Sequence, residues 1–118
     1  MYFSVRSSEA SRISSQVRSI RGDQISVRYL PDDRLAYSVV VPKRQGNAVK
    51  RTRVKRIIRE IMRLHANTLQ HGLYLIYVNR PCTQIDTDTI DAELMTLIDR
   101  ANRRQADLNN ASKPRYNQ

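Results

Sequence analysis

A basic segment that also carries the apolar spacing of a helix constrains this chain most. Eight lysine and arginine residues and no acidic residue lie between Lys43 and Arg59. A run of like charge is usually solvated or disordered, but apolar residues recur through this one as on one face of an α-helix. These residues are Val54, Ile57, Ile58, Ile61 and Leu64, followed by His65. The segment therefore predicts a helix with one buried side and one basic side.

The predicted basic helix runs from about Asn47 to Gln70. Asparagine is a good N-cap, because its side chain accepts a hydrogen bond from a free backbone N–H, and His71-Gly72 is typical of a helix end. At about 100° per residue, the cations from Arg53 to Arg63 fall on the side opposite Val54. A planar guanidinium can bond two phosphate oxygens at once. The basic side therefore favours contact with nucleic acid over solvation alone.

The remaining segments predict an α+β domain with helices packed on a small mixed sheet. In chain order we expect a helix at 8–20 capped by Ser7 or Ser8 and ended by Gly22-Asp23, strands at 25–29 and 35–41, the basic helix, a strand at 73–78 and a helix at 87–104. The continuous apolar run at 73–78 is typical of a central strand covered on both faces. Two strands joined through a long helix suggest a parallel βαβ crossover.

Length and charge narrow the class of protein. A chain of 118 residues fits one domain, and we expect residues 1–108 to form it and 109–118 to be a polar, mobile tail. The net charge of +10 favours polyanionic partners. No apolar run approaches the roughly 18 residues that span a membrane, and no signal peptide is evident. We expect a cytoplasmic protein with no membrane partner.

Few residues suggest chemistry by the chain itself. The single cysteine, Cys82, cannot form an internal disulfide and is interpreted as a reduced thiol. His65 and His71 fit packing or capping positions. The acids at the start of the last helix could form a metal site, but acids also favour a helix N-terminus, where they cap free N–H groups. These acids are Asp86, Asp88 and Asp91. We predict no catalytic residue and no metal site in the chain.

The basic segment resembles the signature of the bacterial ribonuclease P protein component. That signature has a Lys-Lys/Arg pair, a short Gly-Asn-Ala-type turn, and then Arg-Asn-Arg-x-Lys-Arg-x-x-Arg-Glu/Gln. The corresponding positions here are Lys43-Arg44, Gly46-Asn47-Ala48 and the run from Arg51 to Glu60. One position departs from it, because Thr52 stands where the family usually has asparagine. The resemblance is strongest over residues 36–81 and extends more loosely over 25–104.

The resemblance implies both a fold and a function. The family folds as a compact α/β sandwich on a sheet of about four strands, which implies one short strand beyond the three predicted. Its RNA subunit carries the active site and most of the Mg²⁺, while the protein helps the RNA fold and contacts the 5′ leader of precursor tRNA. The resemblance thus implies the protein subunit of an endoribonuclease, bound 1:1 to the catalytic RNA, that promotes hydrolytic removal of the leader.

The same resemblance assigns candidate binding residues. Those for the catalytic RNA are Lys43, Arg44, Asn47, Lys50, Arg51, Thr52, Arg53, Lys55, Arg56 and Arg59. Those for the precursor tRNA leader are Tyr29, Lys55, Asn79 and Arg80. For Tyr29 the alternation of its strand leaves a core position open as the alternative to base stacking. Relatives often place Phe pairs in the first helix, where this chain has Ile13, Val17 and Ile20.

Three other classes of function stay open. A ribosomal or ribosome-assembly protein would share the charge and bind RNA without any part in cleavage. A DNA-binding regulator would need a second helix just before the basic one, whereas residues 35–41 predict a strand. A stand-alone nuclease would need acids clustered with the basic side.

Overall fold

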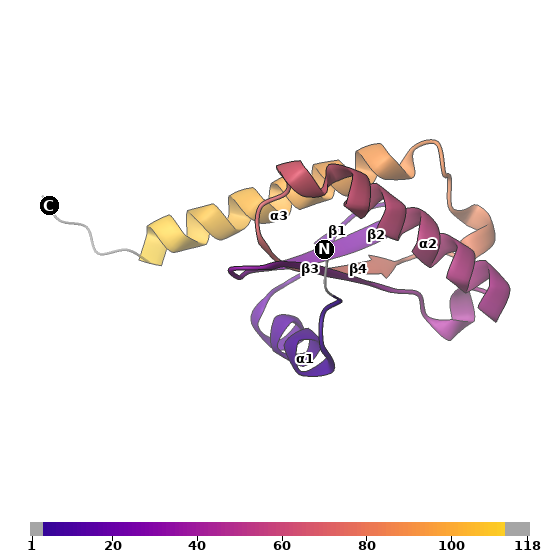
Figure 1. The fold of residues 1–118 in the computed structure, drawn as a ribbon, viewed down its shortest axis with the longest axis horizontal. Coiled ribbons are helices and arrows are strands. Elements are labelled where there is room, and N and C mark those ends of the chain that lie inside the picture. Colours follow the sequence, from indigo (N-terminus) through magenta and orange to yellow (C-terminus); the bar gives the residue numbers. More distant parts are fainter. Residues whose placement is uncertain (1–3, 113–118) are drawn as a thin grey trace, which may run out of the picture.

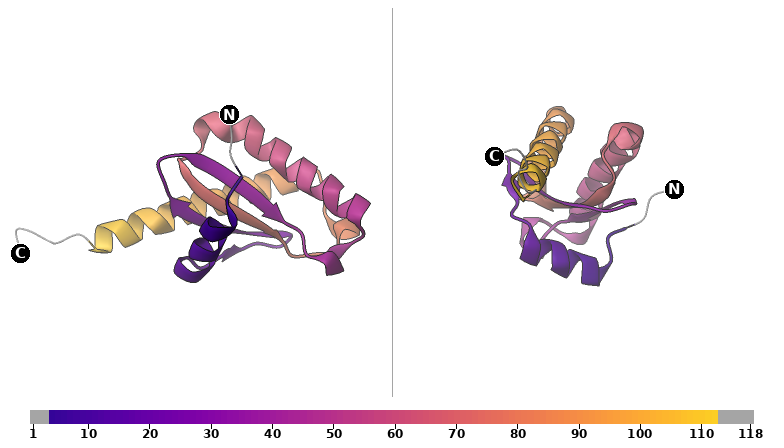
Figure 2. Two further views of the ribbon diagram at one scale, coloured as in Figure 1. Left: turned by 60° about the horizontal axis from the view of Figure 1, so that its bottom comes forward. Right: turned by 90° about the vertical axis from the view of Figure 1, so that its left-hand side faces the viewer.

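The structure, a computed structural model, describes residues 4–112 and the side chains up to Leu108. A four-stranded mixed sheet carries two helices on one face and one helix on the other (Figures 1 and 2). The elements are α1 (Ser7–Gln16), β1 (Ile20–Arg21), β2 (Ile25–Pro31), β3 (Leu35–Val40), α2 (Ala48–His65), β4 (Gly72–Val78) and α3 (Ile90–Ser112). Short 3₁₀ turns lie at Lys43–Gln45, Ala66–Thr68 and Cys82–Gln84. The predicted α+β fold is confirmed.

Strand β4 is the centre of the sheet. The strand order is β1-β2-β4-β3, with β4 antiparallel to β2 and parallel to β3. Helix α2 joins β3 to β4, which confirms the predicted βαβ crossover. The two-residue strand β1 pairs with β2 at the sheet edge and is the short fourth strand that the resemblance implies.

Each face of the sheet has its own core, because successive strand residues point to opposite sides. The face under α2 and α3 buries the larger cluster, which includes Ile25, Val27, Tyr29, Tyr74 and Ile76. The face under α1 buries the smaller cluster, which consists of Ile13, Val17, Ala36, Leu73 and Leu75. Both faces of β4 are therefore covered, which explains its continuous apolar run.

Helix α1 ends earlier than predicted. It stops at Gln16, because Ile20 and Arg21 pair with β2 and the Gly22 N–H closes a turn onto the Ile25 carbonyl. Its N-cap is Arg6, whose N–H donates to the Glu9 carboxylate, so the predicted caps Ser7 and Ser8 are wrong. The early end leaves free carbonyls at the C-terminus of α1. These are bound by the guanidinium of Arg28 on β2, at Ser14 and Val17.

Helix α2 is also shorter than predicted, and its buried side is rotated. It ends at His65, and the 3₁₀ turn at Ala66–Thr68 leads to β4. Leu64, predicted to be buried, is 66% exposed, whereas Met62 is fully buried beside the predicted Ile58. Gly72 does not end a helix but begins β4 with φ +152°, where a side chain would meet the Tyr29 ring.

Helix α3 begins at Ile90, later than the predicted start at 87, and continues past its predicted end at 104. Its apolar side is buried as predicted, at Ile90, Leu94, Leu97, Ile98 and Ala101. After Ala101 the helix leaves the sheet and continues to Ser112 (Figure 1). Four residues of the predicted mobile tail are therefore helical, and 113–118 lie outside the described residues. In the described part of the chain, no helix is long and apolar enough to span a membrane.

Candidate nucleic-acid interface

The turn before α2 joins the first cations firmly to the helix. Lys43 and Arg44 lie exposed on the 3₁₀ turn, and the side chain of Asn47 accepts a hydrogen bond of 2.9 Å from the Lys50 N–H. The predicted N-cap is confirmed. Arg51 is half-buried, and its Nε donates to the Gly46 carbonyl at 3.1 Å. This bond orders the guanidinium but uses one of its donors.

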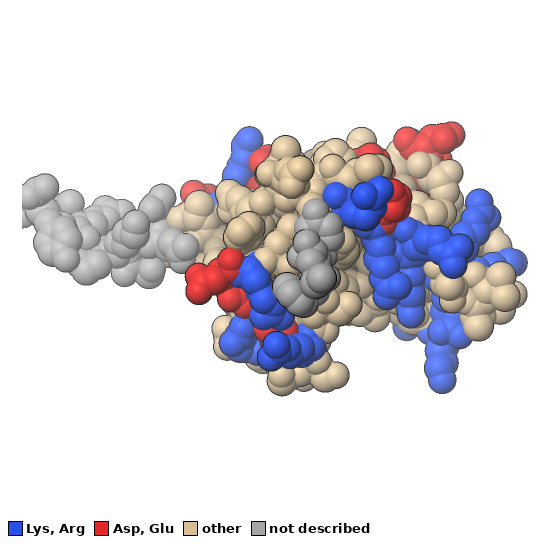
Figure 3. All heavy atoms as spheres, in the orientation of Figure 1, with Lys and Arg blue, Asp and Glu red and all other residues tan. Residues whose placement is uncertain are grey.

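Helix α2 then presents its cations to solvent along one side. Lys50, Arg53, Arg56 and Arg59 are exposed and Lys55 is half-buried, opposite a side that buries Val54, Ile58 and Ile61. Lysine and arginine gather over this helix at the right of Figure 3. Within the described residues, none of the eight cations from Lys43 to Arg59 is paired with a carboxylate. The side is therefore ready to receive anionic groups without first breaking ion pairs.

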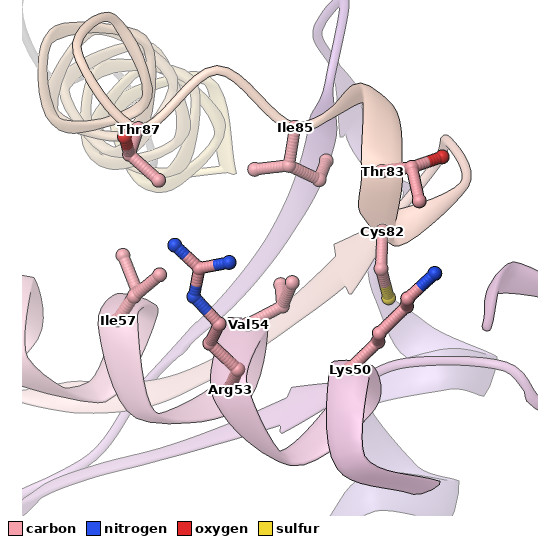
Figure 4. A pocket seen from close by; sticks show the side chains of 8 residues that line it. All are labelled: Lys50, Arg53, Val54, Ile57, Cys82, Thr83, Ile85 and Thr87. Carbon is pink, nitrogen blue, oxygen red and sulfur yellow. The ribbon is translucent and has the colours of Figure 1, made fainter. Parts of the chain in front are cut away.

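A hollow of about 210 Å³ lies between α2 and the loop that follows β4 (Figure 4). Its polar lining consists of Lys50 and Arg53 from the helix and Cys82, Thr83 and Thr87 from the loop. Lys50 and Arg53 on the helix wall offer hydrogen-bond donors suited to a phosphate group, whereas the Thr83 hydroxyl points away from the hollow (Figure 4). Sequence reasoning missed the two threonines, because no spacing links the loop to a helix about thirty residues earlier.

The position that departs from the family signature lies on the same exposed side. Thr52 is exposed and lines a second hollow of about 250 Å³ between α2 and β3. That hollow is also lined by Tyr37, Arg56, Arg59, Glu60 and Arg63. A hydroxyl at this position can still donate one hydrogen bond and accept others, but it lacks the second N–H donor of an amide and its separate donor and acceptor atoms.

The face under α1 carries an aromatic residue that sequence reasoning missed. Tyr77 is half-buried, with its hydroxyl 3.4 Å from Ser14 Oγ on α1. The Arg28 guanidinium carbon lies 5.8 Å from the centroid of the Tyr77 ring, within cation–π range. The continuous apolar run of β4 concealed this ring, because it gives no sign of which strand residues stay accessible.

Tyr29 points to the opposite face, so its predicted stacking on the leader is not supported. Its side chain is only 4% exposed, and its ring centroid lies 4.8 Å from that of Tyr74. The hydroxyl donates to the His71 carbonyl at 2.8 Å, and burial raises the pKa of the phenol. The core position left open for Tyr29 is the one found.

Asn79 and Arg80 contact the β1–β2 turn rather than α2. Asn79 Nδ2 donates to Ser26 Oγ at 2.9 Å and to the Gly22 carbonyl at 3.3 Å. Arg80 forms an ion pair with Asp23. Both side chains are half-buried at the end of β4, and their contacts stabilise the turn as well as leaving part of each side chain accessible.

The acids around the start of α3 make local capping and pairing contacts. Asp86 Oδ1 accepts from the Asp88 N–H at 2.9 Å, and the Asp86 carbonyl accepts from the Ile90 N–H. Asp91 lies 3.0 Å from the His65 ring. Among the described side chains, no group of three or more histidine, cysteine or acidic residues could hold a metal ion.

The fold is a small α+β domain. Its surface carries a row of cations that, among the described residues, are not paired with carboxylates, and hollows lie beside them. Such a surface is typical of a nucleic-acid-binding protein. The sequence profile of the family described as Ribonuclease P matches residues 5–102. The chain therefore belongs to the ribonuclease P protein family.

Individual relatives agree with this assignment. The chain is 30% identical over 98 residues to a ribonuclease P protein component of Exiguobacterium sp., covering 81% of this chain and 86% of that protein. Identity to that of Coprothermobacter proteolyticus is 36% over 66 residues, covering 56% of each chain. Identity to that of Thermus oshimai is 43% over 60 residues, covering 51% of this chain and 40% of that protein. The chain thus spans about half the length of several of the relatives it matches.

The fold matches two solved structures at low identity. The RNase P protein of Staphylococcus aureus superposes with a TM-score of 0.74 at 24% identity, covering 81% of this chain and 91% of that one. That of Thermotoga maritima gives 0.70 at 20% identity, covering 78% and 90%. At these identities the likeness supports the fold alone.

Proposed function

We propose that this chain is the protein subunit of a ribonuclease P and binds its catalytic RNA through the exposed side of α2 and the turn before it. The observation that carries the proposal is the row of unpaired cations on α2, in the order of the family signature. Each phosphate that a cation neutralises releases condensed counterions, so the binding should weaken steeply with salt.

The leader of precursor tRNA would lie on the face under α1. Single-stranded nucleic acid is commonly held by cations together with flat side chains on which bases stack. Tyr77 and Arg28 supply both on this face. Asn79 lies two residues after Tyr77 and so falls on the same side of the sheet. We therefore replace Tyr29 with Tyr77 as the candidate stacking residue, and keep Asn79 and Arg80 as candidate polar contacts. Lys55, the remaining leader candidate, lies on α2 over the opposite face of the sheet, so its contact with the leader would be a separate one.

The reaction served is endonucleolytic hydrolysis that leaves a mature tRNA 5′ end. In this proposal Mg²⁺ belongs to the RNA subunit, as the family resemblance implies, and we assign the chain no step through the ion. The chain would act by holding the folded RNA and the leader in place, so that binding energy far from the cleaved bond positions the substrate.

Reconstitution tests the proposal. The protein would be mixed with the same organism's ribonuclease P RNA and a precursor tRNA, in Mg²⁺ low enough for the RNA alone to react slowly. We expect the protein to accelerate correct 5′ cleavage and Arg53→Gln with Arg56→Gln to reverse the effect. Arg103→Gln is the matched control, since Arg103 is paired with Asp99 on α3.

A second variant separates the two contacts. Tyr77→Ala should raise KM for a substrate with a long leader and leave a substrate with a one-nucleotide leader unchanged. If the protein binds structured RNA but does not accelerate cleavage, the ribosomal or ribosome-assembly alternative replaces this proposal.

A further inference from the structure

Two arginines meet at the sheet edge opposite the basic side of α2. Helix α2 packs over β3, one edge strand, whereas α3 packs over β2 and β1 at the other edge. Where α3 leaves the sheet, the Arg104 guanidinium donates to the main-chain carbonyl of Arg18, in the segment between α1 and β1. This contact joins residues 86 positions apart in the sequence.

Arg18 is exposed and Arg104 is half-buried, and both side chains line the same hollow, so their like charges lie on one site. Desolvation, together with the charge of Arg18, lowers the pKa of Arg104. Among the described residues, neither arginine is paired with a carboxylate, although the adjacent Arg103 is paired with Asp99 at 3.0 Å. Two nearby cations in a partly desolvated site repel each other, and an anion between them would remove that cost.

The arginines line a hollow with the shape and chemistry to accept such an anion. The hollow measures about 410 Å³, and its wall consists of Gln16, Val17, Arg18, Arg104, Gln105 and Leu108. The amide of Gln16 adds hydrogen-bond donors to the two guanidiniums. Leu108 is 56% exposed, so the same hollow offers apolar contact beside the charges. A bare inorganic anion would use only the charges, whereas a nucleotide unit would use both kinds of wall.

We propose that this hollow binds a phosphodiester group of RNA, so that the protein holds RNA at both edges of its sheet. The inference rests on the proposed function, since it takes the RNA to be the ribonuclease P RNA or the precursor tRNA. Guanidinium groups suit phosphate oxygens because of their planar, two-pronged donors. The site lies apart from the family signature, which ends at Glu60.

The test uses two single variants, Arg18→Gln and Arg104→Gln, with Arg103→Gln as the matched control on the same helix. The Arg18→Gln variant keeps the contact between α3 and the α1–β1 segment, because the acceptor in that contact is a main-chain carbonyl. Thermal melts of all variants would show whether the fold is intact. Affinity would be measured against salt, first for ribonuclease P RNA alone and then for precursor tRNA binding to the assembled holoenzyme.

Each of the two variants should weaken one of these bindings about fivefold to eightfold at roughly 0.1 M salt and reduce its salt slope by about 0.7–0.9. The assay in which affinity falls identifies which of the two RNAs the hollow binds. If both arms match the Arg103→Gln control while Arg53→Gln with Arg56→Gln still weakens binding, the inference is overturned and the proposed function stands. If the wild-type protein binds neither RNA, the proposed function fails, and the inference fails with it.

Discussion

The packing of α2 beneath its basic side gives a quantitative prediction. Ile58 is fully buried in the larger core cluster, whereas Leu64, six residues later on the same helix, is 66% exposed. Truncation of Ile58 to alanine removes three carbons, which costs about 2.4 kcal/mol at about 0.8 kcal/mol each. The cavity left behind adds to this, so we expect a loss of about 3–4 kcal/mol in the free energy of unfolding.

Leu64→Ala is the matched control, because it deletes the same number of carbons from an exposed position. We expect it to change the free energy of unfolding by no more than about 0.5 kcal/mol. At about 4 °C per kcal/mol for a chain of this length, Ile58→Ala should lower Tm by about 12–16 °C and Leu64→Ala by about 2 °C. Urea unfolding followed by circular dichroism would give the free energies directly.

The same pair of variants separates folding from binding. At a temperature where both remain folded, their affinity for ribonuclease P RNA should match that of the wild type, because neither changes a cation. Equal losses of Tm for Ile58→Ala and Leu64→Ala would refute the placement of the buried side. A loss below about 1 kcal/mol for Ile58→Ala would do the same.

Two further changes test the contacts that shape the sheet and place α1. Gly72→Ala should unfold the protein or lower Tm sharply, because Gly72 has φ +152° and a Cβ there would lie 2.3 Å from the Tyr29 ring; a thermal melt like that of the wild type would contradict this. The guanidinium of Arg34 lowers the pKa of Glu9 from 4.5 to about 2. A depressed carboxyl pKa stabilises the fold fully above the ordinary pKa, so the Tm difference between wild type and Glu9→Gln should be constant well above pH 4.5, shrink as the pH falls from 4.5 towards 2, and vanish only below about pH 2. A difference that does not shrink between pH 4.5 and pH 2 would show that the pair acts through something other than ionisation.

The local elements could be predicted from the sequence because their signals are periodic. Alternation along 25–29 and the apolar run at 73–78 identified two strands, and the spacing from Val54 to Ile61 identified α2. Apart from the Asn47 cap of α2, the ends of the helices could not be predicted. The Arg28 guanidinium binds the last carbonyls of α1 from the next strand, and the choice of Met62 over Leu64 depends on where β3 lies beneath α2.

The residues of the candidate site likewise divide into those that the sequence could predict and those that it could not. The cations of α2 all lie on one helix, so the side that they share follows from the helical repeat alone. The alternation around Tyr29 left its core position open, whereas the continuous apolar run around Tyr77 gives no sign of which side of β4 stays accessible. The contact between Arg104 and the Arg18 carbonyl depends on how far α3 extends past the sheet, and no local sequence pattern indicates that length.

The predicted RNA-binding residues differ in whether their side chains also stabilise the start of α2. The Asn47 side chain caps α2, and Arg51 Nε donates a hydrogen bond to the Gly46 carbonyl. Changing either residue would therefore disturb the start of the helix as well as any contact with RNA. Arg53, Arg56 and Arg59 have no such ties among the described residues and are exposed. Loss of affinity in their variants would report on phosphate contacts alone, and for that reason they, rather than Asn47 or Arg51, measure what the basic side of α2 contributes.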